Sequence, residues 1–405
     1  MKILKGGITE AKGFLASGIH CGLKKRKEKL DLALIYSEVL ANGAAVYTQN
    51  IVKGNPILVC KDHLSDGSAQ AIIINSGNAN TCTGEEGLKR AYYMSELVAE
   101  KYNIDKNNVL VASTGVIGVP LKIEYIESNI DNLINNLSKK GNIYAREAIM
   151  TTDLIKKEVA VSFKIDDKTV TIGGMAKGSG MINPNMATTL GFITTDINID
   201  KSLLKEALNI AVNKSFNRIS VDGDQSTNDT VIILANGLAK NDAILEKDKY
   251  YYDFLDSLTY VLVELAKLVA RDGEGATKLI ECRISGCKTE EEAVILSKSV
   301  INSSLVKTAI FGNDANWGRI LCALGYCGIE FDVNKVELCF ESAKGYICVF
   351  KNGLPLNFDE DKAKQILDEN DISILININK GKEEGFAFGC DLSYEYVRIN
   401  GDYRT

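Results

Sequence analysis

The residues best suited to chemistry lie in one stretch, 177–190, which reads KGSGMINPNMATTL. Within it, Ala187 and Thr188 form a junction just ahead of the apolar run at 190–193. A threonine that becomes a new N-terminus after the chain cuts itself carries both nucleophile and base, because its own α-amine can take the hydroxyl proton. Taken alone, the same Ala-Thr pair would be read as a loop that enters a buried strand. The rest of the chain has to decide between these two interpretations.

Histidine is scarce, since only His20 and His63 occur in 405 residues. A histidine-rich metal site is therefore excluded, and a Ser-His or Cys-His pair would have to use one of these two. Neither lies in a segment with other catalytic signals, so we interpret both as surface or packing residues. A hydrolase or transferase built on this chain needs another base. A free α-amine, which titrates near pH ~7.7–8.0, suits that role at neutral pH.

Polar and glycine residues gather where apolar strands begin or end. Loops on rigid elements commonly carry binding and catalytic residues, although Gly, Asn and Asp also favour plain turns. No G-x-x-x-x-G-K-[ST] phosphate loop occurs, and no G-x-G-x-x-G follows a strand and opens a helix, so nucleotide-binding folds have little support. The polar clusters lie at 75–80, 113–118, 220–230 and 272–278.

Composition is that of an ordinary globular protein, with 45% hydrophobic and 25% charged residues. A net charge of −6 argues against nucleic acid or an anionic membrane as the main partner. The chain has no apolar run of membrane-spanning length, and its first residues lack a secretory apolar segment, which predicts a cytoplasmic location. Ten cysteines occur without a C-x-x-C pair, so we expect reduced, buried thiols and no metal or cofactor.

Short β-rich runs alternate with amphipathic helical patterns, which predicts a mixed α/β protein. We place a boundary near residue 285, between a larger domain at 1–285 and a smaller one at 286–405. Strands are expected at 56–60, 71–75, 109–113, 158–165, 169–172, 190–194, 230–234, 278–284, 336–340, 346–350 and 372–378. Helices are expected at 85–102, 122–137, 201–213, 253–270, 290–305 and 359–367.

The sequence around Thr188, KGSGMINPNMATTLGFITTD, resembles the self-cleavage region of the ornithine acetyltransferase family, the ArgJ proteins of arginine biosynthesis. Other segments resemble family segments in the family's order, and they extend over essentially the whole chain. As a set these strings are highly specific. They read GITEAKGFLASGI, NSGNAN, VASTGVIG, AIMTTD, SFNRISVDGDQSTNDTVIILANG, RDGEGATK, FGNDANWGRI and GCDLSYEYVRINGDYRT.

This resemblance implies a layered αββα-type sandwich, as in the DmpA and ArgJ proteins, with a smaller C-terminal α/β domain. It implies a precursor that cuts itself between Ala187 and Thr188 into pieces of 187 and 218 residues, which stay together as a heterotetramer of two α and two β chains. Thr188 would then take the acetyl group from N2-acetylornithine, release ornithine and pass the acetyl group to glutamate.

The same resemblance assigns roles to individual residues. Thr114 and Gly115 would form the oxyanion hole, in which losing one donor typically costs about 2.7–4 kcal/mol. Donor and acceptor share an α-carboxylate and differ in side-chain charge, so we expect Lys177 to bind the carboxylate and Glu274 the cationic amine of ornithine. Spacing favours Thr151 over Thr152 as a contact, and the contacts near the terminus imply that the C-terminal tail returns to the site. The substrate contacts implied are Thr151, Lys177, Thr188, Glu274, Asn400 and Thr405.

Some positions depart from the usual family pattern, and some alternatives stay open. Thr189 stands where the family generally has Met, Leu154 where a Thr is common, and Gly401 where an Ala is common. A self-processing N-terminal-nucleophile amidase or aminopeptidase would use the same loops with water as acceptor. A metabolite-binding protein would never cleave. Acetyl-CoA also stays open as a second donor, because the same acyl-threonine would form from it.

Overall fold

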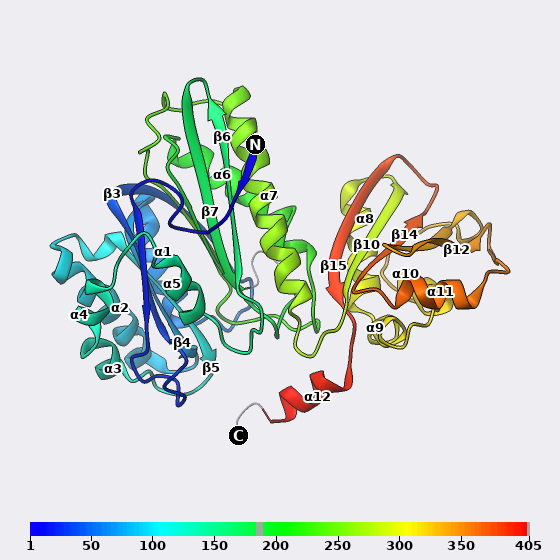
Figure 1. The fold of residues 1–405 in the computed structure, drawn as a ribbon, viewed down its shortest axis with the longest axis horizontal. Coiled ribbons are helices and arrows are strands. Elements are labelled where there is room, and N and C mark those ends of the chain that lie inside the picture. The colour runs from blue at the N-terminus through cyan, green and yellow to red at the C-terminus, as the bar shows by residue number, and fades with distance from the viewer. Residues whose placement is uncertain (184–188, 403–405) are drawn as a thin grey trace. The chain divides into compact units, whose positions relative to one another are not determined.

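The structure is a computed structural model that describes residues 1–183 and 189–402 (Figure 1). The chain divides into two compact units, which are described separately. Unit 1 comprises Met1–Gly178, Pro184–Asn217 and Gln225–Leu265, and unit 2 comprises Ser179–Asn183, Arg218–Asp224 and Ala266–Thr405. The boundary expected near residue 285 lies inside strand β10 (Leu279–Cys287), whereas the two units divide within helix α7 (Lys249–Arg271).

Unit 1 is built on a mixed sheet to which nine strands of the described residues belong. The strands are β1 (Lys2–Leu4), β2 (Phe14–Ile19), β3 (Leu32–Tyr47), β4 (Ser68–Asn78), β5 (Val109–Val116), β6 (Lys157–Ile165), β7 (Lys168–Lys177), β8 (Leu190–Thr195) and β9 (Thr230–Ala235). Their order is β1-β6-β7-β8-β9-β3-β4-β5, with β2 paired to β3. The β4–β5 and β8–β9 pairs are parallel, and the others are antiparallel.

The long strand β3 joins the two wings of this sheet. Its first half pairs with β2 and β4, and its second half pairs with β9. The central strands β8 and β9 are buried along their whole length, as expected for strands covered on both faces. One hydrophobic core includes Ile73 on β4, Phe192 on β8 and Leu234 on β9, so it extends through both wings.

Helices cover the strands of unit 1. Helices α1 and α2 pack on β5, α5 packs on β2 and β3, and α6 packs on β3. Their bounds are α1 (Asn55–His63), α2 (Gly84–Tyr102), α3 (Ile123–Glu127), α4 (Ile130–Asn135), α5 (Asn142–Ala148) and α6 (Lys201–Asn213), with α7 running on into unit 2.

Three of the expected segments are helices that differ from the prediction in type, number or end, and the strand expected at 169–172 is longer, since β7 continues to Lys177. The strand expected at 56–60 is helix α1, because Pro56 fits the first helical turn and the buried residues recur at helical spacing. The single helix expected at 122–137 is two short helices, since Asn129 ends one turn by bonding the Tyr125 carbonyl with its side chain. The helix expected at 290–305 stops at Asn302, because the Ser303 hydroxyl accepts the Val306 N–H and caps a new helix.

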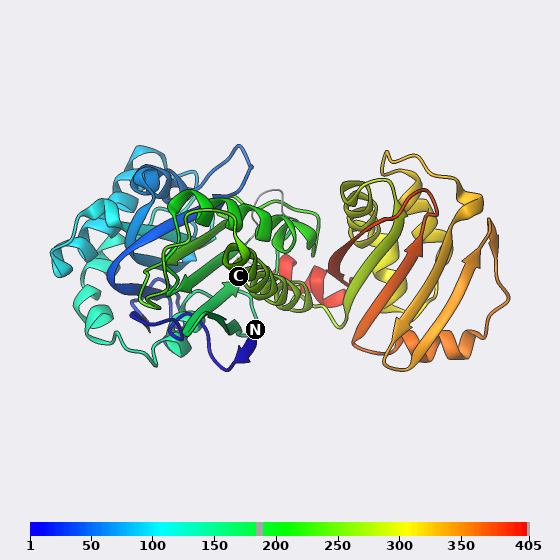
Figure 2. The same cartoon turned by 90° about the horizontal axis from the view of Figure 1, so that it is seen from above.

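Unit 2 carries a six-stranded sheet in the order β13-β12-β11-β14-β10-β15 (Figure 2). Burial alternates along β14, so one face of the sheet holds the core and the other is partly exposed. The remaining strands are β11 (Glu337–Ser342), β12 (Gly345–Lys351), β13 (Leu354–Pro355), β14 (Asp371–Asn377) and β15 (Glu383–Cys390). The helices are α8 (Glu290–Asn302), α9 (Ser304–Phe311), α10 (Trp317–Gly325), α11 (Glu360–Leu367) and α12 (Tyr394–Gly401).

The expected α/β class is therefore confirmed, with helices layered on mixed sheets and a smaller α/β unit towards the C-terminus. Within residues 1–183 and 189–402, no single helix is long and apolar enough to cross a membrane. Helices α8 and α9 pass that test only as a pair, and they meet at a bend of 62°.

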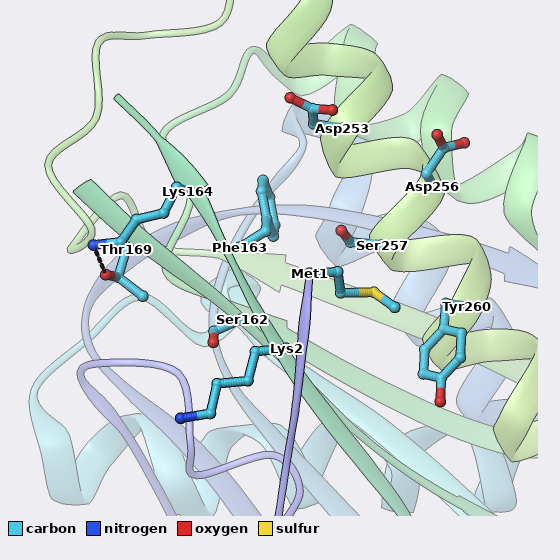
Figure 3. Close-up of a pocket in the computed structure, with 10 residues that line it drawn as sticks. All are labelled: Met1, Lys2, Ser162, Phe163, Lys164, Thr169, Asp253, Asp256, Ser257 and Tyr260. Carbon is cyan, nitrogen blue, oxygen red and sulfur yellow. Dashed lines mark hydrogen bonds between the residues drawn. The ribbon is translucent and has the colours of Figure 1, made fainter. Parts of the chain in front are cut away.

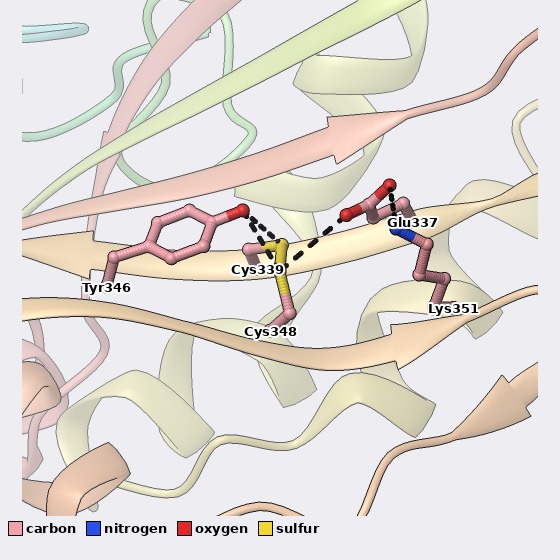
Figure 4. The surroundings of a disulfide bond; sticks show 5 residues. All are labelled: Glu337, Cys339, Tyr346, Cys348 and Lys351. Atoms are coloured by element: carbon pink, nitrogen blue, oxygen red, sulfur yellow. Dashed lines mark hydrogen bonds and ion pairs between the residues drawn. A yellow bond between two sulfur atoms is a disulfide. The ribbon is translucent and has the colours of Figure 1, made fainter.

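The expectation that all ten cysteines are free thiols is wrong for two of them. Cys339 on β11 and Cys348 on β12 lie opposite each other in the strand register and form a disulfide (Figure 4). The Tyr346 hydroxyl lies 2.8 Å from Cys339 Sγ, and Glu337 beside it pairs with Lys351. The sequence shows only that each cysteine sits in an apolar run. The pairing arises from the hairpin register, which no single run reveals.

This disulfide makes a countable prediction about thiols in the purified protein. Unfolded without reductant, the chain should expose eight thiols, and reduction should raise the number to ten. A thiol-reactive dye measures both values. Cys348→Ser should show one more thiol than the wild type before reduction, because Cys339 loses its partner. Ten thiols before reduction would contradict the pairing.

Candidate active site

The end of strand β5 places Thr114 and Gly115 against the parallel end of β4. Gly115 has a φ of +135°, and a Cβ there would lie 2.3 Å from the carbonyl carbon of Gly77. Only glycine meets both the left-handed conformation and this close approach. The strand continues to Val116 with a shift in its register against β4, and the Thr114 side chain is half-buried at this edge of the sheet.

Lys177 lies beside these residues although it comes from another strand. It is the last residue of β7, where it pairs in register with Leu190 of β8, two residues after Thr188. Its Nζ donates to Thr114 Oγ1 at 3.3 Å, and its side chain is largely buried. Because an ammonium only donates, the hydroxyl hydrogen of Thr114 is not used in this bond and can point to an anionic oxygen.

The buried amide of Asn228 ties these strand ends together. Its Nδ2 donates to the Ala79 carbonyl at 2.6 Å and to the Ser113 carbonyl at 3.0 Å. Its Oδ1 accepts from the hydroxyls of Thr81 and Thr227, both at 2.6 Å. The amide thus uses its whole hydrogen-bonding capacity. It links the loop before β9 to the ends of β4 and β5.

Asp153 organises the segment that contains Thr151. Its Oδ2 accepts the Thr151 N–H at 2.9 Å, and its Oδ1 accepts the Gly178 N–H at 2.7 Å. Lys157 Nζ lies 2.7 Å from Oδ1, and both side chains are fully buried. Burial alone would raise the pKa of Asp153, but the charges of Lys157 and Lys177 outweigh it and the pKa is lowered. One carboxylate therefore positions two of the expected substrate contacts, Thr151 and the neighbour of Gly178, Lys177.

The backbone at Thr189 is strained. This residue has a φ of +128°, a region that β-branched side chains rarely adopt and that costs about 1–3 kcal/mol. Its N–H donates to Asp229 Oδ1 at 2.8 Å, and its carbonyl accepts from the Thr230 N–H at 2.9 Å. These two bonds hold the strained conformation, and the Thr189 hydroxyl is buried without a partner among the described residues.

Unit 2 brings together two other expected contacts, Glu274 and Asn400. Asn400 on α12 donates from Nδ2 to Glu274 Oε2 at 2.8 Å, and the Glu274 N–H donates to the Ser179 carbonyl at 2.8 Å. A Cβ on Gly180 would lie 2.3 Å from the Glu274 carboxylate, so a larger residue here would displace that side chain. Glu274 is largely buried beside the segment that leads towards Thr188.

Asp222 fixes the backbone of that same segment within unit 2. Its carboxylate accepts the N–H groups of Met181 and Ile182, at 2.6 and 2.9 Å. The Tyr396 hydroxyl on α12 donates to the same carboxylate at 3.3 Å. Burial, followed by the charge of Asp222, raises the pKa of Tyr396, so the phenol stays protonated. Ala187, Thr188 and Thr405, which the sequence also singles out, lie outside the described residues.

Both histidines contact backbone carbonyls away from the candidate site. His63 is buried with Nδ1 2.8 Å from the Val109 carbonyl, and His20 Nδ1 lies 2.8 Å from the Lys29 carbonyl and 3.3 Å from Asp31. Neither contacts the residues described above. The expectation that they are packing or surface residues is confirmed.

A cavity of about 780 Å³ lies elsewhere in unit 1, between the strands β1 and β6 and helix α7 (Figure 3). Lys2 and Lys164 line it from the strands, and Asp253 and Asp256 line it from the helix. The Lys164 ammonium is already bound to the Thr169 hydroxyl at 2.8 Å. None of the residues expected from the sequence to act on a substrate lines this cavity.

Known proteins resemble this chain along most of its length. The model of the family described as "ArgJ family" matches residues 15–405. The chain belongs to the ArgJ family. It is 52% identical over 405 residues to the arginine biosynthesis bifunctional protein ArgJ of Caldanaerobacter subterraneus subsp. tengcongensis, with 100% of each chain covered. It is 48% identical over 407 residues to the ArgJ of Oceanobacillus iheyensis, covering 100% of this chain and 98% of that one.

An ArgJ chain solved by crystallography, from Bacillus halodurans, is 44% identical with a TM-score of 0.50. The match covers 52% of this chain and 97% of that chain. The family resemblance stated from the motifs is thus confirmed over the full length.

In this ArgJ family member, the sequence did not single out the buried residues that support the candidate site. Asp153, Lys157, Asn228 and Asp229 are all buried, and all bond to the backbone or to one another near the expected contacts. Asn228 and Asp229 lie in the polar cluster at 220–230, and Asp153 ends the string AIMTTD, whereas no sequence signal marked Lys157. Which of several polar residues points inward cannot be read from such a cluster.

The Asp153–Lys157 pair makes a prediction about stability. Lys157→Ala should lower the free energy of unfolding by roughly 3–5 kcal/mol, because it leaves a buried carboxylate without its counter-charge. Urea denaturation at neutral pH measures this loss. Since the pKa of Asp153 is lowered on folding, its contribution is present above the ordinary aspartate pKa and disappears as the pH falls through the lowered value.

Lys168→Ala is the matched control, because it breaks an exposed pair with Asp167 in the same unit. Exposed pairs contribute little, so its denaturation curve should stay close to that of the wild type. If both variants lost the same free energy of unfolding, the buried Asp153–Lys157 pair would contribute no more to stability than an exposed pair.

Proposed function

We propose that this chain is an acetyltransferase that moves the acetyl group of N2-acetylornithine to glutamate in arginine biosynthesis. The chain first cuts itself between Ala187 and Thr188, and the freed threonine becomes the nucleophile. The observation that carries the proposal is the strained Thr189, which directly follows Thr188 and lies one residue from Leu190, the register partner of Lys177. Strain held next to a bond that must react is a common feature of functional sites.

The reaction has two halves. The Thr188 hydroxyl attacks the acetyl carbon while its α-amine takes the hydroxyl proton, and the C–N bond of acetylornithine then breaks as ornithine leaves with that proton. Glutamate's amine next attacks the acetyl-threonine ester, which restores the hydroxyl. Both halves pass through an oxyanion, which the Thr114 hydroxyl and the Gly115 N–H stabilise. The bond from Lys177 to Thr114 Oγ1 supports this, because it orients the hydroxyl without using its hydrogen.

Charge explains how two different amino acids could be recognised. Lys177, with Thr151 close to the same Asp153 carboxylate, binds the α-carboxylate that both substrates share. Glu274, oriented by Asn400, binds the cationic side chain of ornithine. The relatives are named bifunctional, so we also propose acetyl-CoA as a second acetyl donor.

The length of the solved relative supports self-cleavage. Its chain is covered to 97% by a match that spans only 52% of this chain, so that chain is about half as long. Cleavage at Ala187–Thr188 would divide this chain at a similar fraction of its length.

We also propose a heterotetramer of two α and two β chains in the cytoplasm. The family resemblance supports both proposals, whereas the Cys339–Cys348 disulfide is uncommon in a reducing compartment. Sedimentation of the cleaved protein tests the assembly, and a single heterodimer would contradict it. Cell fractionation tests the location, and recovery outside the cytoplasm would contradict it.

Self-cleavage predicts two bands on a denaturing gel. The wild type should separate into pieces of 187 and 218 residues. Thr188→Ala should stay as one band, because it lacks the hydroxyl that attacks. Thr189→Ala, the matched control with the adjacent hydroxyl removed, should still cleave. If Thr189→Ala blocked cleavage and Thr188→Ala did not, the nucleophile would be the second threonine.

Acetyl transfer predicts that ornithine release depends on glutamate. With acetylornithine alone, the purified protein should release ornithine slowly, and added glutamate should raise the rate while acetylglutamate accumulates. Glu274→Gln should raise the KM for acetylornithine without changing the KM for glutamate, since only the former substrate places a cation there. Fast release without glutamate would indicate an amidase, and no release under either condition would contradict an enzymatic role.

A further inference from the structure

The carboxyl group of Asp229 is hydrogen-bonded to Thr189, the residue that follows Thr188. Asp229 directly precedes β9 and is 3% exposed. Its Oδ1 accepts the Thr189 N–H at 2.8 Å. Its Oδ2 is buried, and among the residues that the structure describes it has no hydrogen-bond partner. Leaving a buried carboxylate oxygen unpaired is costly, which indicates a hydrogen-bond donor beside it in the working enzyme.

Covalent geometry points to that group. The Thr189 nitrogen belongs to the peptide bond that follows Thr188. Successive backbone nitrogens are separated only by a Cα and a carbonyl carbon, which standard bond lengths place about 3 Å apart. One carboxylate can therefore bind both nitrogens, one with each oxygen. Before cleavage the Thr188 nitrogen is an amide, and afterwards it is an amine.

We propose that Asp229 is a positioning residue for acetyl transfer, whose Oδ1 holds the Thr189 N–H and whose Oδ2 orients the α-amine that cleavage creates. This inference rests on the proposed function. When Thr188 Oγ bonds to the acetyl carbon, its proton moves to the α-amine, and the Asp229 carboxylate stabilises the resulting ammonium. As the C–N bond breaks, that proton passes to the leaving amine of ornithine. Asp229 stays ionised throughout, in the way that a third group orients the base of a catalytic triad.

The electrostatic setting agrees with this role. Burial raises the pKa of Asp229 to about 7, while the hydrogen bond from Thr189, the polar groups of nearby Ser226 and the charge of Lys177 lower it. Lys177 faces it from the end of β7 as the neighbouring cation. An α-ammonium beside it would favour the ionised carboxylate further. Since the role needs that form, transfer should weaken as the pH falls below about 7.

The variant Asp229→Asn in the full-length chain separates the two roles of the carboxylate, which are to accept the Thr189 N–H and to stabilise the α-amine. The amide keeps an acceptor for the Thr189 N–H but carries no charge, so self-cleavage should persist on a denaturing gel. The kcat for acetyl transfer should fall by about 10²-fold, the scale of assisted proton transfer. The acid limb of the kcat profile should also become less steep, because one of two ionisations is lost. Asp229→Ala removes the acceptor too and should slow cleavage itself.

Asp196→Asn is the matched control. Asp196 directly follows β8 in the same sheet, is fully buried, and accepts the Thr171 N–H at 2.8 Å. Burial raises its pKa as well. This variant should keep the wild-type kcat profile whatever it does to the melting temperature. An equal change in shape for both variants would show a general effect of losing a buried carboxylate and would overturn the proposal.

Two further outcomes would also overturn it. One is a wild-type kcat and acid limb in Asp229→Asn. The other is a wild-type acid limb that fits a single ionisation, which requires no variant to fold. If Asp229→Asn remains uncut, the negative charge of Asp229 is needed for self-cleavage. That result would contradict the proposal that the charge acts only on the α-amine after cleavage. Failure of the wild type itself to release ornithine with glutamate would count against the proposed function instead.

Discussion

The buried amide of Asn228 is the interaction on which the arrangement of unit 1 depends. Four hydrogen bonds join it to two carbonyls at the ends of β4 and β5 and to two threonine hydroxyls. A half-satisfied amide in this position would cost more than an apolar side chain, whereas a satisfied one specifies a unique geometry. These bonds therefore hold the loop before β9 in one position relative to Thr114 and Gly115. Lys177, which comes from β7, reaches the same strand ends through its bond to Thr114.

Two buried aspartates near these strand ends have pKa values that are shifted in opposite directions. Asp153 lies against Lys157, and the pair of charges lowers its pKa in spite of complete burial. Asp229 has no cation in direct contact among the described residues, and burial raises its pKa. The first is a permanent structural anion that holds backbone N–H groups. The second has a pKa raised to about 7, so its negative charge is lost more readily as the pH falls.

Several features of the fold followed from the sequence, and others did not. Apolar runs with turn residues at their ends located most central strands, because burial on both faces demands such runs. The helix α1 was misread because residues 56–60 form a short apolar run, which periodicity cannot assign to strand or helix. The disulfide was missed because Cys339 and Cys348 meet only through the register of two strands. Pairing information of this kind is absent from any single segment.

By itself the sequence determined the α/β class, the family, and a chemistry without histidine, because motif strings and residue counts are local properties. It also identified Thr114, Gly115, Thr151, Lys177, Glu274 and Asn400 as candidates. Only the tertiary structure decided which of them lie together and what holds them there. Lys177 reaches Thr114 across 63 positions of the chain, and Asp229 reaches Thr189 across 40. The polar groups that position the site are buried in the folded chain, and burial is a property that no residue has until the strands have packed.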